Sequence, residues 1–341
     1  MDGPGPHQSR KHLRLLATLL VGANAMWPAI LAAQTSEAPL LLEAKIALGE
    51  VSGRIDHLGI DIKRQRLFVA ELGNNTLGVV DLAAARVLRT ITGFREPQGV
   101  AHVPFADSVY VANAGDGSVR VLRGDDLAPV GRIELGDDAD NVRVNVPRNR
   151  VLVGYGKGAL AILDPATQAK IADIRLKGHP EGFQIDETGT RAFVNVPDAR
   201  DIEIVDLAAG SARSLPTEGA GSNFPMAIDA EAQRVLVVFR SPPTLMALSS
   251  QDGRVVAKVE TCGDADDAFV DSRRRRIYVS CGEGVVDVLE RSQTGYSRLA
   301  RVPTVPGART SLFAPELDRL FVAVRARSGE PAAVWVFRPM P

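Results

Sequence analysis

The sequence predicts an all-β protein, a seven-bladed β-propeller of four-stranded blades. The main observation is a strand-like quartet, in which an aromatic residue or Leu precedes Val and two further residues, that recurs at intervals of 42, 42, 41, 43, 42 and 43 residues. A repeat of about 40 residues with four short strands is typical of a propeller blade. No apolar period of 3.6 residues persists for ten residues, so we expect few helices. The seven quartets begin at Phe68, Tyr110, Leu152, Phe193, Leu236, Tyr278 and Phe321.

Each quartet is the second strand of its unit. The third strand often ends in Asp-Leu, as at Asp81-Leu82 and Asp206-Leu207, and a fourth strand follows after a turn. The last unit stops at Pro341 without a fourth strand, whereas a spare strand, residues 44–48, precedes the first unit. We expect this N-terminal strand to complete the last blade, because ring closure removes exposed sheet edges. The sequence thus predicts a single β-propeller domain over residues 34–341.

The N-terminus has the pattern of a signal peptide. A basic segment, residues 10–14, leads into an apolar run that ends at the small-x-small site Ala23-Asn24-Ala25. A membrane anchor is the alternative, because residues 15–33 carry no charge, but Pro28 interrupts that run and no basic stop-transfer cluster follows it. We expect a signal peptide over residues 1–33, cleaved after Ala25 or Ala33. The mature chain, without a membrane span, is then periplasmic or secreted.

Charge and motifs exclude several functions. The 40 Lys and Arg residues against 41 Asp and Glu residues give a net charge of −1, so the chain has no basic excess with which to neutralise nucleic-acid phosphates. The sequence contains no Gly-x-Ser-x-Gly nucleophile motif. It also lacks a Gly-rich phosphate loop with the required Lys-Ser/Thr. We therefore expect no nucleic-acid partner and assign no catalytic residue.

One repeat carries a family resemblance. The segment Tyr110-Val111-Ala112-Asn113, followed by Gly115 and Val119, resembles the YVTN-type repeat of seven-bladed propellers. With its 42-residue spacing, the mature chain is similar to the YncE-like secreted proteins of bacteria, within the WD40-like superfamily but without the Trp-Asp pairs of true WD repeats. The resemblance implies a recognition scaffold. Propellers host lactonases, lyases and dehydrogenase subunits as well, so the fold leaves the activity open.

The resemblance also indicates where a site would lie. In propellers of this kind, the loop that leads into the innermost strand of each blade lines one mouth of the central tunnel, and Arg240 leaves the second strand of the fifth blade on the same face. We call these seven segments the mouth loops: residues 53–57, 96–99, 138–141, 179–182, 222–225, 264–267 and 307–310. We expect them to bind a small polar ligand or a protein or peptide partner. The candidate ligand-binding residues are Arg54, His57, Gln98, Asn141, Glu181, Asn223, Arg240, Asp266, Asp267 and Arg309.

An alternative function is a metal-dependent lactonase or lyase at the same mouth. The oxygen-bearing side chains of the third, fourth and sixth mouth loops would suit Ca²⁺, the one cofactor that we consider. A transition-metal site would need His57, His102 and His179 to converge. We expect that they do not, because His102 falls in the strand body rather than in a mouth loop. The oxygen donors in question are Asp138, Asp140, Asn141, Glu181, Asp266 and Asp267.

The two cysteines are expected to form a disulfide. Cysteines of an exported chain are usually paired, because the compartment is oxidising. Cys262 opens the loop into the sixth blade and Cys281 ends the second strand of that blade, so antiparallel pairing brings both to the mouth end. The alternative is a reactive thiol at Cys281, although nothing adjacent in the sequence lowers its pKa.

Overall fold

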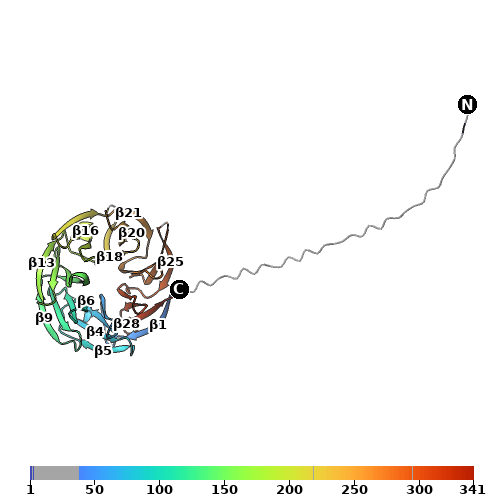
Figure 1. Cartoon of the computed structure of the whole chain (residues 1–341). Coiled ribbons are helices and arrows are strands. Elements are labelled where there is room, and N and C mark those ends of the chain that lie inside the picture. The colour runs from blue at the N-terminus through green and yellow to red at the C-terminus, as the bar shows by residue number, and fades with distance from the viewer. Residues whose placement is uncertain (2, 4–37, 218, 294) are drawn as a thin grey trace. The chain divides into compact units, whose positions relative to one another are not determined.

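The computed structural model describes residues 1, 3, 38–217, 219–293 and 295–341, and a β-propeller occupies the part from residue 38 onward. Seven antiparallel four-stranded sheets are arranged in a ring, as Figure 1 shows. The helical elements among the described residues are three single 3₁₀ turns, η1 (Leu72–Asn74), η2 (Val146–Arg148) and η3 (Pro197–Ala199). The predicted fold class is confirmed. Residues 4–33 of the expected signal peptide lie outside the described residues.

Four blades follow the chain from the innermost to the outermost strand. Blade one consists of β2 (Leu58–Asp61), β3 (Arg66–Glu71), β4 (Thr76–Asp81) and β5 (Arg86–Ile91). Blade two consists of β6 (Pro97–Val103), β7 (Ser108–Asn113), β8 (Ser118–Arg123) and β9 (Pro129–Glu134). Blade three consists of β10 (Ala139–Asn145), β11 (Arg150–Tyr155), β12 (Ala159–Asp164) and β13 (Ala169–Arg175). Blade four consists of β14 (Phe183–Ile185), β15 (Arg191–Val196), β16 (Asp201–Asp206) and β17 (Ser211–Pro216).

Three further blades complete the ring. Blade five consists of β18 (Gly221–Asp229), β19 (Arg234–Ser241), β20 (Pro243–Ser249) and β21 (Val255–Glu260). Blade six consists of β22 (Ala265–Asp271), β23 (Arg276–Cys281), β24 (Val285–Ser292) and β25 (Gly295–Pro303). Blade seven consists of β26 (Ser311–Ala314), β27 (Arg319–Val324), β28 (Ala333–Pro339) and β1 (Leu40–Ala47).

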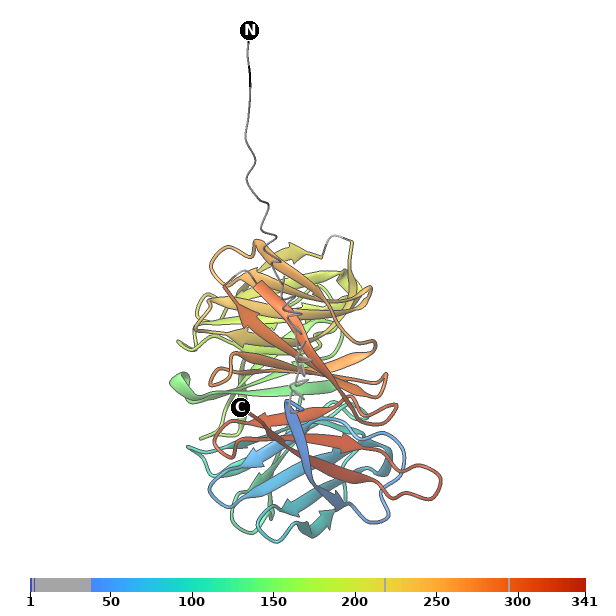
Figure 2. The same cartoon turned by 90° about the vertical axis from the view of Figure 1, so that its right-hand side faces the viewer.

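The N-terminal strand closes the last blade, as the sequence predicts. β1 pairs antiparallel with β28, from Leu40 opposite Pro339 to Ala47 opposite Ala333. Figure 2 shows the blue N-terminal strand beside the red C-terminal strands. Closure leaves the ring without an unpaired inner edge, which stabilises the whole propeller rather than one blade.

The hydrophobic core lies between neighbouring blades. Phe68 and Val79 of blade one pack with Val109 and Val111 of blade two in one buried cluster. Second and third strands are therefore covered on both faces and consist of continuous apolar runs, whereas an outer strand such as β5 alternates weakly and is largely exposed. This pattern explains why the second-strand quartets are the clearest repeat in the sequence.

The predicted disulfide is present. Cys262 and Cys281 are bonded, with Cα atoms 6.0 Å apart, and both residues are fully buried. The bond joins the segment that leads into blade six to the mouth end of β23, so it fixes the sixth mouth loop. The alternative of a reactive Cys281 thiol is wrong.

Among the described residues, no helix is long and apolar enough to span a membrane.

Candidate functional site

The innermost strands line two cavities along the axis of the ring. The cavity on the mouth side is bordered by Asn141, Glu181 and Phe224. The second has a volume of about 330 Å³ and is bordered by apolar side chains such as Ile60 and Leu312. The residues that line both cavities, and so form the constriction between them, are His57, Arg143, Gln184, Asp267 and Phe269. The tunnel therefore has a polar, highly charged mouth above a more apolar lower part.

Irregularities in the inner strands position the mouth side chains. The register shifts between Ala139 and Val142 in β10 and between Ala265 and Asp267 in β22. A bulge inserts residues without a partner across the ladder and turns their side chains out of the regular alternation. In these two strands it turns Asp140, Asn141 and Asp266. Inner strands of neighbouring blades also approach closely: a Cβ atom on Gly99 of β6 would lie 2.2 Å from the Asp140 carbonyl oxygen.

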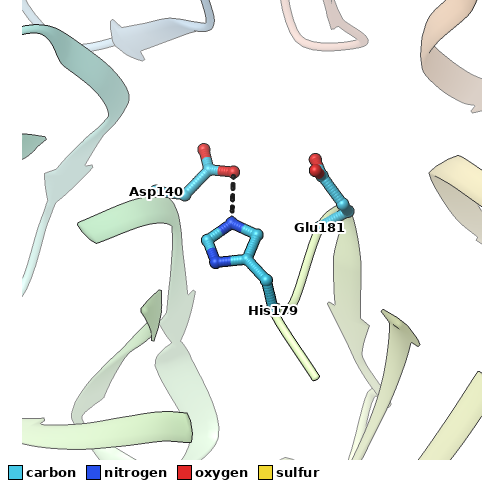
Figure 3. Close-up of side chains that lie close together, drawn as sticks. All are labelled: Asp140, His179 and Glu181. Carbon is cyan, nitrogen blue, oxygen red and sulfur yellow. Dashed lines mark ion pairs between the residues drawn. The ribbon is translucent and has the colours of Figure 1, made fainter. Parts of the chain in front are cut away.

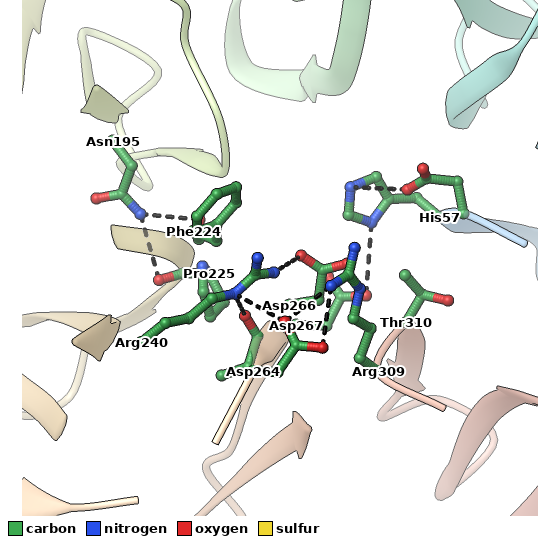
Figure 4. Close-up of polar contacts among 12 residues, drawn as sticks. His57, Asn195, Phe224, Pro225, Arg240, Asp264, Asp266, Asp267, Arg309 and Thr310 are labelled. Atoms are coloured by element: carbon green, nitrogen blue, oxygen red, sulfur yellow. Dashed lines mark hydrogen bonds and ion pairs between the residues drawn. The ribbon is translucent and has the colours of Figure 1, made fainter. Parts of the chain in front are cut away.

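Two aspartates of blade six bridge two arginines of neighbouring blades (Figure 4). Arg240, at the end of β19, contacts Asp266 Oδ1 at 2.5 Å and donates to the Ala265 carbonyl at 2.7 Å. Arg309, before β26, lies 2.9 Å from Asp266 Oδ2 and 2.8 Å from Asp264 Oδ1. Because each carboxylate serves both guanidinium groups, the two arginines are held side by side at the mouth.

An aromatic ring supports one of these arginines. The guanidinium carbon of Arg240 lies 3.6 Å from the ring centre of Phe224, a cation–π distance. The backbone of Phe224 is fixed in turn, because Asn195 donates to its carbonyl oxygen at 2.9 Å and Asn223 donates to Asn195 Oδ1 at 3.0 Å. Asn223, one of the predicted ligand-binding residues, is fully buried and supports this loop instead of lining the cavity.

One arginine of the mouth has no partner. Arg325 directly follows β27 and is half-buried, and no described residue forms a hydrogen bond or ion pair with its side chain. Burial lowers its pKa, and the positive charges of Arg309 and Arg54 lower it further. Arg54 itself pairs with Asp56 at 2.7 Å. The mouth thus contains an uncompensated guanidinium group among other arginines.

His57 lies between two carboxylates at the constriction. Its Nδ1 is 3.4 Å from Asp267 Oδ2 and its Nε2 is 3.6 Å from Asp56 Oδ1. Burial alone would lower the pKa of His57, but Asp267, with smaller contributions from Asp56 and Asp140, raises it to about 10. His57 is therefore a charged, hydrogen-bonded imidazolium at neutral pH and not a free base.

A second group of titratable residues lies on blades three and four (Figure 3). Asp140, His179 and Glu181 have potential metal-ligating atoms that all lie within 4.8 Å of one another. His179 Nε2 is 3.6 Å from Asp140 Oδ2. Burial and the nearby charge of Asp140 raise the pKa of Glu181 to about 8. Within the described part of the chain, this is the one such group of three that could hold a metal ion.

The predicted site residues divide into two groups. Arg54, His57, Arg240, Asp266, Asp267 and Arg309 gather around the charged half of the mouth. Asn141 and Glu181 line the same cavity from blades three and four. Gln98 lines neither tunnel cavity.

The expected metal donors do not gather as the sequence suggested. Asp266 is paired with arginines and Asp267 with His57, so blade six does not join Asp140 and Glu181 in one oxygen cage. The three histidines do not converge either. His102 lies at the other end of its inner strand, 3.4 Å from Asp107.

Several mouth residues were missing from the predicted set. Arg325 occupies the same repeat position as Arg240, four residues after the first quartet residue, and comparing these positions would have found it. His179 and Asp140 stand in the mouth loops, but their proximity depends on the packing of blade three against blade four. Arg143 lies inside β10, where only the tunnel geometry shows that it borders both cavities.

Comparisons with known proteins identify the fold. No family model and no curated protein matches the sequence. A chain of the hydrazine synthase of Kuenenia stuttgartiensis has a TM-score of 0.73 at 16% identity, covering 84% of this chain and 97% of that chain. A chain of a mitotic checkpoint complex has a TM-score of 0.73 at 14% identity, covering 95% and 98%. At such low identity the similarity establishes the propeller fold alone.

Proposed function

We propose that this protein is a periplasmic or secreted YVTN-type propeller that binds a small organic carboxylate at its tunnel mouth. The observation that carries the proposal is the guanidinium group of Arg325, which has no partner among the described residues and lies close enough to Arg309 and Arg54 to be repelled by both. Placing like charges together in a partly desolvated site costs free energy. An anionic ligand would remove that cost on binding.

The balance of charges favours a ligand with a single negative charge. Arg54, Arg240, Arg309 and Arg325 face Asp56, Asp264 and Asp266, whereas Asp267 pairs with His57. The four guanidinium groups therefore exceed the three carboxylates by one formal charge. A planar guanidinium group binds a carboxylate through two parallel hydrogen bonds. A monocarboxylate matches this excess better than a phosphate dianion does.

Two further features support export and binding. The Arg and Ala pattern of residues 10–25 is that of a signal peptide, and a disulfide is typical of an oxidising compartment. Phe224, under Arg240, offers an aromatic face beside the anion site. We favour binding over a metal-dependent lactonase or lyase because the arginine group needs no further residue to hold an anion, whereas hydrolysis needs a positioned base.

The test is binding of defined anions to the mature chain, residues 34–341, without an affinity tag. Acetate, benzoate, lactate and phosphate are titrated calorimetrically at low salt. We expect at least one monocarboxylate to bind more tightly than phosphate, and Arg325→Gln to weaken that binding about tenfold, the effect of losing one charge-assisted hydrogen bond. Arg273→Gln is the matched control, because Arg273 is 78% exposed on the opposite face.

The proposal fails if none of these anions binds, or if Arg325→Gln binds as tightly as the wild-type protein. Capture of a folded protein or peptide by the mouth, with no affinity for free carboxylates, would favour the alternative of a macromolecular partner. The thermal midpoint of each variant, measured without ligand, separates lost binding from lost folding.

A further inference from the structure

The group formed by Asp140, His179 and Glu181 takes no part in the proposed anion site. Asp140 lies in the bulge of β10, and His179 and Glu181 lie in the loop that precedes β14. The arginines of the anion site belong instead to blades one, five and seven. Figure 3 shows the two carboxylates and the imidazole directed toward the same space. Its role therefore needs a separate explanation.

The imidazole of His179 is oriented as a metal ligand would be. Its Nδ1 lies 2.7 Å from the Gly156 carbonyl oxygen. Because a carbonyl oxygen only accepts, Nδ1 carries the proton and donates it, and the unprotonated neutral form then offers Nε2 toward Asp140. A hydrogen bond from the distal ring nitrogen to a backbone carbonyl is the usual arrangement behind a metal-bound histidine.

Two oxygen-bearing groups beside His179 lack partners. No described residue forms a hydrogen bond or ion pair with the Glu181 carboxylate. The side chain of Asn141 is 1% exposed and its Oδ1 has no partner. That amide is at the cluster, because its Nδ2 is 3.4 Å from Asp140 Oδ1 and Asn141 lines the same cavity as Glu181. A buried polar atom without a partner is uncommon in native proteins and indicates an absent ligand.

We propose that Asp140, His179 and Glu181 bind one first-row divalent metal ion, Zn²⁺ or Mn²⁺, with the Asn141 amide oxygen beside it. Two carboxylates and one imidazole form the mixed donor set that such ions accept, whereas Ca²⁺ and Mg²⁺ prefer oxygen ligands alone. Three protein ligands leave further coordination positions for water or a ligand. This inference goes beyond the proposed function, since the metal site requires no carboxylate ligand.

The test uses the metal alone. The untagged mature chain is freed of metal with a chelator, dialysed, and titrated with ZnCl₂ and separately with MnCl₂ against a competing chromophoric chelator. We expect one equivalent of Zn²⁺ or Mn²⁺ to bind and to raise the thermal midpoint. X-ray absorption of the Zn²⁺ form should show a shell of nitrogen and oxygen atoms with one imidazole.

Three variants locate the ion. His179→Ala and Glu181→Gln should each lower the affinity for Zn²⁺ at least tenfold. His102→Ala is the matched control, an imidazole beside carboxylates at the other end of the tunnel, and should leave the affinity unchanged. The circular dichroism spectrum and metal-free thermal midpoint of each variant show whether it folds.

The inference is overturned by the absence of saturable Zn²⁺ and Mn²⁺ binding, by tighter binding of Ca²⁺ than of both, by full affinity in folded His179→Ala, or by loss of binding in His102→Ala. Its outcome is independent of the anion site. Arg325→Gln should retain metal binding, and His179→Ala leaves the arginines that hold the proposed carboxylate in place.

Discussion

The two faces of the propeller use the same residue types in opposite ways. On the face opposite the mouth, Arg64 binds Asp61 at its own inner strand and Asp107 of the next blade, at 2.8 and 2.7 Å. Five repeats later, Arg274 binds Asp271 and Asp318 in the same arrangement. At the mouth, by contrast, Arg325 and Glu181 have no partner among the residues described. Paired charges that recur with the repeat connect blades, whereas single unpaired charges indicate a binding site.

The disulfide gives the largest expected effect, because it fixes the mouth covalently while the other face depends on ion pairs. Replacing Cys262 and Cys281 together with Ala should lower the free energy of unfolding by about 3 kcal/mol, the chain-entropy value for a loop of this length. Urea unfolding of the wild-type protein and the double variant measures it. Equal stabilities would mean that packing alone holds the sixth mouth loop.

The second prediction concerns the buried imidazolium at the constriction. The pKa of His57 is about 10 in the folded protein and 6.5 in the unfolded chain. The stability that His57 contributes is therefore fully present below pH 6.5 and is lost as the pH rises toward 10. We expect a loss on the order of 2 kcal/mol, the range for a hydrogen bond to a charged group.

Urea unfolding between pH 6 and 10 tests this prediction. The difference in stability between the wild-type protein and His57→Gln should shrink across that window, because Gln retains hydrogen bonding but cannot carry the proton. The groups that face His57 are Asp56, Asp140 and Asp267, and their charges are shared by both proteins. A difference that stays constant with pH would show that His57 is neutral when folded.

The third prediction tests the opposite face. Asp318→Asn should lower the free energy of unfolding by about 1 kcal/mol, since it removes a two-bond ion pair with Arg274 that is partly exposed to solvent. Asp107→Asn, the equivalent change in the second repeat, should cost less because Asp107 is 50% exposed. Denaturant midpoints at 0.1 M salt measure both. Increased stability in either variant would show that these pairs do not connect the blades.

The repeat made the fold predictable from the sequence, and it had less to say about the site. Quartets such as Tyr278-Val279 are buried on both faces in every blade, so the same apolar pattern had to recur seven times. Sequence position also brought Cys262 and Cys281 together. The mouth loops are the part of each unit that does not repeat, and the bulges in β10 and β22 reorient side chains by an amount that no pattern of residues indicates.

The residues missed at the mouth show where such reasoning ends. The proximity of Asp140 to His179 arises between blades, from the close approach of inner strands that Gly99 permits on one side of blade three. Arg240 was selected as an isolated arginine, yet its role depends on Asp264 and Asp266, which also bind Arg309. Contacts between side chains far apart in sequence decide which charges stay unpaired.

The smallest expected effect on stability has the opposite sign and compares two arginines of one repeat position. Arg325→Gln should raise the free energy of unfolding by about 0.5 kcal/mol at low salt, because it removes a charge that Arg309 and Arg54 repel. Arg240→Gln should lower it, since Arg240 is bound to Asp266 and stacked on Phe224. The gain in Arg325→Gln should shrink in 1 M NaCl, where screening weakens the repulsion. If Arg325→Gln is instead as destabilising as Arg240→Gln, Arg325 belongs to the structural network and the mouth contains no spare positive charge for an anion.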